Sequence, residues 1–216
     1  MGSRERILAR IRRAQGRGGD APPEAERDLV QQYLSSHPRG PMRESGSDLV
    51  ECFRERAAAS ASTIDAVASE REVPAAVARY LEAHPIPGRG CAWPALSRLD
   101  WAGAGLSLDA RAARGEDPVG VTGVYCAIAE TGTLCVLSAT DSPASASLVP
   151  ETHVAIVPAG RIVGSMEDAW DLMRAELGQL PRAVNYISGP SRTADIEQTV
   201  VVGAHGPARV HIVIVG

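Results

Sequence analysis

Apolar residues recur at helical spacing in the first part of the chain and then gather into short runs. Residues 24–35 and 48–59 carry apolar side chains three and four positions apart, which predicts two amphipathic helices. From residue 61 the period changes: apolar runs at 63–68 and 90–93 predict buried strands, and a helix is expected over 74–83. Alternation of buried strands with helices is typical of an α/β fold whose sheet is largely parallel.

The second half of the chain is richer in strand patterns. Ser165 is placed to cap a helix over 166–177, with Asp168 as its capping-box partner. The last two strands are expected to complete the same sheet. Expected strands in this half are 119–124, 126–129, 134–137, 153–157, 183–187 and 210–215. We therefore expect a helical N-terminal extension over residues 1–60 and one α/β domain over residues 61–216.

Composition narrows the chemistry. Apolar residues make up 44% of the 216 residues and charged residues 22%, as in ordinary globular proteins. The net charge is −4 and the basic residues are scattered, which argues against nucleic-acid binding. All 22 basic residues are arginine. The absence of lysine excludes Schiff-base chemistry, including that of pyridoxal phosphate enzymes, and a phosphate-loop lysine.

The four cysteines show no CxxC pair, so the sequence predicts neither a zinc site nor an iron–sulfur cluster, and no cofactor is expected. They are interpreted as reduced, buried thiols.

No signal peptide and no apolar run of about 18 residues is found, so we expect a cytoplasmic protein without a membrane span. The basic segment 4–17 places Ile7, Leu8 and Ile11 on one helical face. This is either a docking or oligomer helix or a frayed terminus.

Three polar clusters interrupt the apolar strands: AETGT at 129–133, GPSRTADIE at 189–197 and GAHGP at 203–207. In an open α/β sheet, loops at the carboxyl ends of the strands converge on one crevice. We therefore expect the three clusters to form one shared site at that edge.

The cluster at 189–197 has the composition of an anion site. A strand that ends at Gly189 and Pro190 would present backbone N–H groups beside two hydroxyls and one guanidinium. The expected ligand contacts are Thr131, Gly132, Gly189, Ser191, Arg192 and Thr193. The alternative is a plain turn followed by a helix start, in which Asp195 and Glu197 offset the helix dipole. Asp195 is thus either structural or catalytic.

Two further residues could act in catalysis. Glu130 lies in a tight turn and could be a general base or a nucleophile; alternatively it closes a hairpin or pairs with Arg192. His205 lies between a small residue and glycine, where its ring could titrate near neutral pH or simply bond a carbonyl in a turn. His153 and His211 lie in apolar strands and are expected in the core. Glu130, Asp195 and His205 show no close ligand pair, so no metal site is predicted.

With these clusters in this order, the chain resembles the lactate utilization protein C family, which is built on the LUD domain. The resemblance is strongest from about residue 119 to the end of the sequence. It implies a fold similar to the sugar-phosphate isomerase and CoA-transferase superfamily, a parallel-rich sheet flanked by helices. It also implies a non-redox accessory role in oxidising L-lactate to pyruvate, with iron–sulfur proteins as partners. A small anionic ligand and an oligomer are compatible with this role.

A second interpretation of the residues is that the chain is an independent enzyme. In that case Glu130 would serve a CoA transferase or thioesterase, or a sugar-phosphate isomerase. A third reading is a regulatory ligand sensor that makes its contact through the basic helix. The family resemblance brings no established catalytic residue, so the candidate site residues rest on their chemistry and spacing alone.

Overall fold

The computed structural model describes residues 2–17, 22–41, 48–196 and 199–216. The chain divides into two compact units, residues 1–42 and residues 43–216. The first unit contains helices α1 (Ser3–Ala14) and α2 (Glu24–Ser36), which bury none of their side chains. None of the described helices is both long and apolar enough to cross a membrane.

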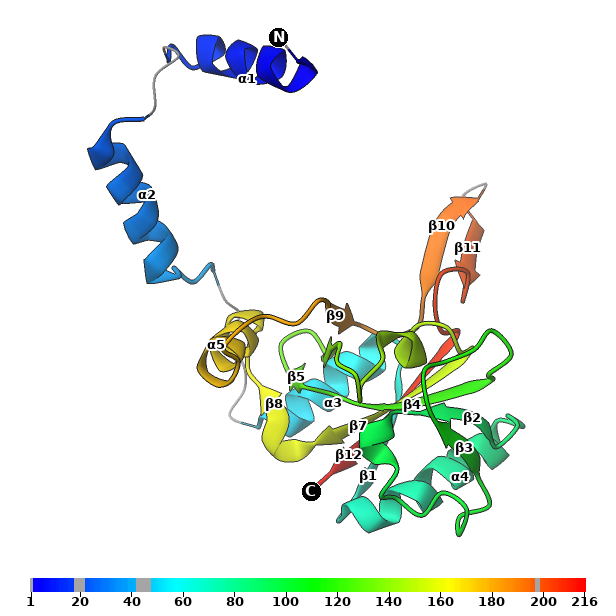
Figure 1. Ribbon diagram of the computed structural model, residues 1–216. Coiled ribbons are helices and arrows are strands. Elements are labelled where there is room, and N and C mark those ends of the chain that lie inside the picture. Colours follow the sequence, from blue (N-terminus) through cyan, green and yellow to red (C-terminus); the bar gives the residue numbers. More distant parts are fainter. Residues whose placement is uncertain (1, 18–21, 42–47, 197–198) are drawn as a thin grey trace. The chain divides into compact units, whose positions relative to one another are not determined.

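The second unit is built on a six-stranded sheet in the order β1-β12-β7-β4-β2-β3, and each neighbouring pair is parallel. This confirms the predicted parallel-rich α/β fold. Its strands are β1 (Thr63–Val67), β2 (Arg89–Ala92), β3 (Ser107–Ala110), β4 (Val119–Gly123), β7 (Thr152–Pro158) and β12 (Arg209–Val215). Figure 1 shows β12, in red, running through the middle of this unit.

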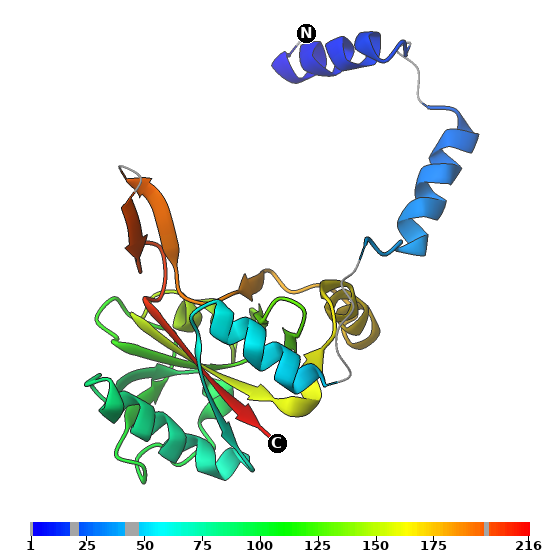
Figure 2. The same ribbon diagram turned by 180° about the vertical axis from the view of Figure 1, so that it is seen from behind.

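Helices cover both faces of the parallel sheet. Helix α4 (Val73–Ala83) packs on one face, against residues such as Val213 and Val215 of β12. Helix α3 (Leu49–Ala59) packs on the other, where Phe53 and Ala57 are fully buried. Figure 2 shows α3 and α4 on this unit from behind. Because successive strand residues point to opposite faces, burial on both faces requires the continuous apolar runs seen in the sequence.

The position of α3 bears on the expected division near residue 60. That division assigns residues 48–59 to a helical extension, whereas α3 contributes its buried face to the core of the second unit. Asp48 caps the helix, since its side chain accepts a hydrogen bond from the N–H of Glu51. The amphipathic pattern of residues 48–59 therefore reflects packing on the sheet.

Four strands form a second sheet in the order β8-β5-β6-β9. They are β5 (Cys126–Ile128), β6 (Thr133–Leu137), β8 (Ile162–Val163) and β9 (Val184–Ile187). The expectation that the strand at 183–187 completes the main sheet is therefore wrong. Helix α5 (Met166–Glu176) covers this sheet and buries Ala169 and Met173 against it. Apolar content predicted these strands, but it does not encode which sheet each one joins.

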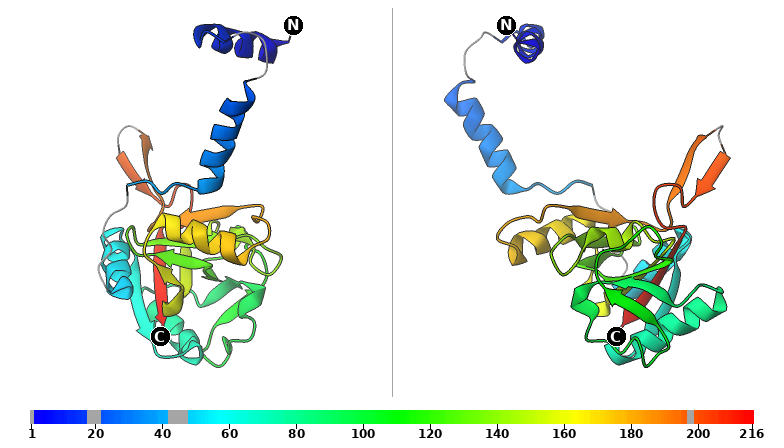
Figure 3. Two further views of the ribbon diagram at one scale, coloured as in Figure 1. Left: turned by 90° about the vertical axis from the view of Figure 1, so that its left-hand side faces the viewer. Right: turned by 45° about the vertical axis from the view of Figure 1, so that its right-hand side comes forward.

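The segment after β9 forms a hairpin of β10 (Arg192–Ile196) and β11 (Thr199–Val202). It projects from the rest of the second unit in both views of Figure 3. The predicted helix start at Asp195 is wrong, because this residue lies in a strand. Single-turn 3-10 helices occur at Glu70–Glu72, Pro94–Leu96, Ala144–Ser147 and Ala159–Arg161.

Candidate functional site

The three polar clusters gather near one edge of the parallel sheet. We call the edge where the parallel strands begin the amino edge, and the edge where they end the carboxyl edge. GAHGP directly precedes β12, so it lies at the amino edge. The other two clusters touch the C-terminal end of α3 and Ser60, just before β1 begins. The predicted location at the carboxyl edge is therefore wrong: the first two clusters follow strands of the second sheet, and the third precedes its strand.

The AETGT cluster is the turn of the β5–β6 hairpin, as one of the alternatives predicted. Gly132 has φ 64°, and a Cβ there would lie 2.3 Å from the backbone nitrogen of Ala57. Only glycine allows the turn to approach α3 this closely. Hydroxyl groups then link the turn to Ser188, the residue before the second cluster: Thr131 to Thr133 at 2.7 Å, and Thr133 to Ser188 at 2.6 Å.

Ser191 joins the second cluster to the third. Its N–H donates to the carbonyl of Pro207 at 2.9 Å, and its own carbonyl accepts from the N–H of Gly203 at 2.9 Å. Its Oγ accepts from the N–H of His205 at 3.4 Å. Gly189 has φ 72°, and a Cβ there would lie 2.0 Å from the carbonyl oxygen of Ser60. We call this contact region the Ser191 junction.

The ionisable residues of the Ser191 junction face outward. Arg192 is exposed at the start of β10, opposite Val202, and His205 is exposed in the GAHGP loop. Thr193 is half-buried in β10, opposite Val201. The backbone of Asp195 lies in β10, and Glu197 lies outside the described residues.

The side chain of Glu130 bonds to helix α5. Its Oε1 accepts a hydrogen bond from the N–H of Met166, the first residue of α5, at 2.9 Å. Ser165 and Asp168 form the predicted capping box at the same helix end. A carboxylate at a helix N-terminus offsets the helix dipole, so Glu130 stabilises α5 in this structure.

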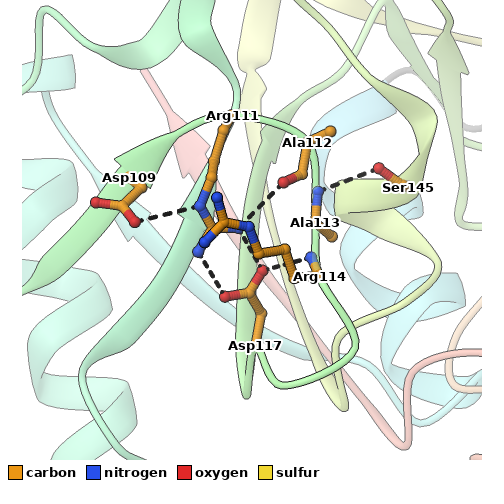
Figure 4. A network of polar contacts seen from close by, with 7 residues as sticks. All are labelled: Asp109, Arg111, Ala112, Ala113, Arg114, Asp117 and Ser145. Carbon is orange, nitrogen blue, oxygen red and sulfur yellow. Dashed lines mark hydrogen bonds and ion pairs between the residues drawn. The ribbon is translucent and has the colours of Figure 1, made fainter.

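A polar cavity of about 330 Å³ opens at the amino edge. Gly203 and Gly206 of the third cluster line it, opposite Asp117 and Glu151. Asp117 is buried, and Arg111 donates to its two carboxylate oxygens at 2.6 and 2.8 Å (Figure 4). These hydrogen bonds from Arg111 lower the pKa of Asp117 to about 2. The wall of the cavity is thus fixed by an ion pair, and neither residue was predicted from the sequence.

His153 and His211 are buried, in agreement with the predicted core positions. One ring nitrogen of each is paired with a threonine hydroxyl: His153 Nε2 with Thr122 at 2.8 Å, and His211 Nδ1 with Thr63 at 2.9 Å. The other ring nitrogen of each has no partner among the described residues. Burial lowers the pKa of both histidines to about 4, so both are neutral at pH 7.

A second cavity of about 220 Å³, which was not predicted from the sequence, lies at the carboxyl edge. After β2 the chain continues to its neighbour β3 on one side, whereas after β4 it continues to its neighbour β7 on the other side. The direction in which strands are added therefore reverses between β2 and β4. Crevices form at such reversals. The lining residues are Trp93, Ala95, Val124, Tyr125, Leu137, Asp141 and Ser142. A signal was present, because an aromatic residue follows each of these two buried strands within two positions.

Tyr125 anchors this carboxyl-edge cavity. Its hydroxyl donates to Glu176 at 2.7 Å, and the guanidinium of Arg161 lies 4.7 Å from the ring centroid. Arg161 also donates to both carboxylate oxygens of Glu176, at 2.7 and 2.9 Å. Burial, together with the hydrogen bond to Glu176, raises the pKa of Tyr125 to about 12.

In the described residues, no group of three or more His, Cys, Asp or Glu side chains is placed to hold a metal ion.

Comparison with known proteins defines the class. The LUD domain model matches residues 97–215, which is more than half of the chain, and the chain belongs to this family. The match includes all three polar clusters. A crystal structure of a DUF162 family protein from Deinococcus radiodurans shares the fold, with a TM-score of 0.59 over 81% of this chain and 100% of that chain. The sequence identity between the two is 22%.

Among curated proteins, the chain is similar to lactate utilization protein C. It is 42% identical to the Bacillus subtilis protein over 100 residues, which are 45% of this chain and 42% of that protein. It is 35% identical to the Bacillus licheniformis protein over 127 residues, 57% of this chain and 53% of that protein. The matched segments thus span about half the length of these relatives.

Proposed function

We propose that this chain acts in L-lactate utilization as a non-redox component that works beside iron–sulfur proteins in the oxidation of lactate to pyruvate. The observation that carries the proposal is the similarity of the chain to lactate utilization protein C, with 42% sequence identity over 100 residues. Membership of the LUD domain family supports the same role. The iron–sulfur partners are inferred from the family resemblance, and this sequence has no cysteine spacing of its own for a cluster.

We place the binding of a small anionic ligand at the Ser191 junction. The N–H and Oγ of Ser191 already hold the GAHGP loop, so Ser191 is a positioning residue. Arg192 and His205 are exposed beside it and can meet a ligand. Lactate and pyruvate are carboxylates, and the planar guanidinium of arginine binds a carboxylate through two parallel hydrogen bonds.

The alternative is an enzyme that uses Glu130 as a base or nucleophile. The contact of Glu130 with α5 favours the accessory role, because its Oε1 already accepts the N–H of Met166. An enzyme of this kind would convert acyl-CoAs or sugar phosphates, and Glu130→Gln would abolish that conversion. We expect the purified protein to turn over neither substrate class.

The functional proposal is tested by growth. A strain from which the gene is deleted should fail to grow on L-lactate as sole carbon source and should still grow on glucose. Normal growth on lactate would refute the proposed role.

Binding is tested separately, by titrating L-lactate and pyruvate into the purified protein in a calorimeter. Arg192→Gln should weaken binding about tenfold or more, since a charge-assisted bond is lost. Arg182→Gln, which removes another exposed arginine, should leave affinity unchanged. Equal affinity in the two variants would move the ligand away from Arg192.

A further inference from the structure

The first unit leaves its apolar residues uncovered. Seven of the eleven large apolar side chains that are exposed in the described part of the chain lie on α1 and α2. They are Ile7, Leu8, Ile11, Leu29, Val30, Tyr33 and Leu34, each between 38% and 66% exposed. A stripe of this size on a soluble helix is normally covered by another element.

The apolar residues form one stripe on each helix. On α1, Ile7 and Ile11 are four residues apart, with Leu8 beside them. On α2, Leu29 and Tyr33 are four apart, as are Val30 and Leu34. Side chains at this spacing share a helix face. Helices of twelve and thirteen residues are marginal in water by themselves, so these two require packing to be stable.

The charges of the two helices are complementary. Helix α1 carries five arginines and one glutamate, whereas α2 carries three acidic residues and one arginine. The acidic residues of α2 lie in its first half, at Glu24, Glu26 and Asp28. The arginines at 10, 12 and 13 lie in the second half of α1. An antiparallel pairing of α1 with α2 therefore brings opposite charges together, and Arg17 already forms an ion pair with Glu26.

We propose that α1 and α2 from two copies of this chain pack as an antiparallel four-helix bundle and make the protein a dimer. One α1 and one α2 can cover only one side of each stripe, whereas four helices enclose both stripes in a common core. At 1.5 Å per residue the helices are about 18 and 20 Å long, so they match along their length. A second copy supplies both a basic and an acidic helix. An anionic membrane would suit α1 but would repel α2.

The oligomeric state of the full-length protein tests the proposal, measured by light scattering on a sizing column and by sedimentation equilibrium. The wild type should have twice the 22.7 kDa chain mass at micromolar concentration. Leu29→Asp with Tyr33→Asp should raise the dimer dissociation constant about a hundredfold or more, because carboxylates would enter the bundle core. Leu180→Asp with Val202→Asp changes two exposed apolar residues of the second unit and should leave the dimer intact.

Charge reversal tests the pairing itself. Arg10→Glu with Arg13→Glu should weaken the dimer, and adding Glu24→Arg with Asp28→Arg should restore it. A wild-type monomer would overturn the proposal, whether or not the monomer binds vesicles of anionic lipid or another protein. A dimer that survives Leu29→Asp with Tyr33→Asp, with the helical signal of circular dichroism unchanged, would also overturn it.

Discussion

The amino and carboxyl edges of the parallel sheet differ in what they hold together. At the amino edge, backbone hydrogen bonds of Ser191 join the second and third polar clusters, and the buried Asp117 forms an ion pair with Arg111 at the cavity wall. At the carboxyl edge, the cavity has aromatic and apolar walls, and its ion pair between Arg161 and Glu176 is partly exposed. The amino edge therefore holds the polar clusters, and the ion pair of its buried Asp117 should contribute more to stability than the partly exposed pair at the carboxyl edge. Stability measurements on matched variants can test this difference.

The largest effect is expected for Arg111→Met, which removes the charge partner of Asp117 at the amino edge. Asp117 would remain buried without its charge partner, so the free energy of unfolding should fall by about 3 to 5 kcal/mol in urea titrations at pH 7. Because the pKa of Asp117 is depressed, this contribution is present above the unfolded pKa and is lost as the pH falls toward 2. Asp109→Asn, which removes the exposed partner of Arg111, should cost about 1 kcal/mol or less. Equal losses would show that burial of Asp117 is not decisive.

The next effect, counted for a single residue, is the loss of stability in acid that each of the two buried histidines causes. Their folded pKa of about 4 lies below the unfolded value, so the unfolded state binds more protons between these pH values. Stability should therefore fall from about pH 6.5 to about pH 4, by roughly 3 kcal/mol for each histidine. His153→Gln should reduce this pH dependence, whereas the exposed His205→Asn should not. A flat profile between pH 7 and 5 in urea unfolding would contradict the assignment.

A smaller effect is expected at the carboxyl edge, for Tyr125→Phe. The variant loses the hydroxyl that donates to Glu176, while Arg161 still pairs with that carboxylate. The expected loss is about 1 kcal/mol, measured by urea unfolding at pH 7. Ser107→Ala on β3, which removes an exposed hydroxyl, is the control and should show no loss. A loss as large as that of Arg111→Met would remove the difference between the two edges.

The smallest effect is expected for Glu130→Gln. Glutamine keeps an oxygen that can accept the N–H of Met166 but lacks the charge that offsets the dipole of α5. The expected loss is about 0.3 to 1 kcal/mol. Glu55→Gln, on the exposed side of α3, should be neutral. If Glu130→Gln were neutral while Glu130→Ala were destabilising, the hydrogen bond alone would explain the contact.

Much of the fold could be predicted from the sequence. The positions of α2, α3, α4, α5 and most strands follow from periodicity and from caps such as Ser165 with Asp168. The hairpin of β10 and β11 could not be predicted, because Ser, Thr and Asp after a Gly-Pro turn equally favour a helix start. The assignment of β5, β6 and β9 to a second sheet depends on long-range pairing, which local patterns do not encode.

The candidate site was predicted in part. The contact between the second and third clusters follows the prediction of a shared region, with Ser191 at its centre. The site was predicted at the carboxyl edge of the sheet but lies near the amino edge. Loops that follow strands converge on one edge only when those strands belong to one parallel sheet, and the first two clusters follow strands of the second sheet. Arg111 and Asp117 were missed, since a single charged pair six residues apart carries no distinctive sequence signal.

The central claim, that the amino edge carries the function, is tested most directly by complementation of the deletion strain on L-lactate. We predict that Arg192→Gln with His205→Asn fails to restore growth although the protein accumulates normally. Tyr125→Phe with Asp141→Asn, the matching pair at the carboxyl edge, should restore growth fully. Restored growth with the amino-edge pair and failure with the carboxyl-edge pair would contradict the account.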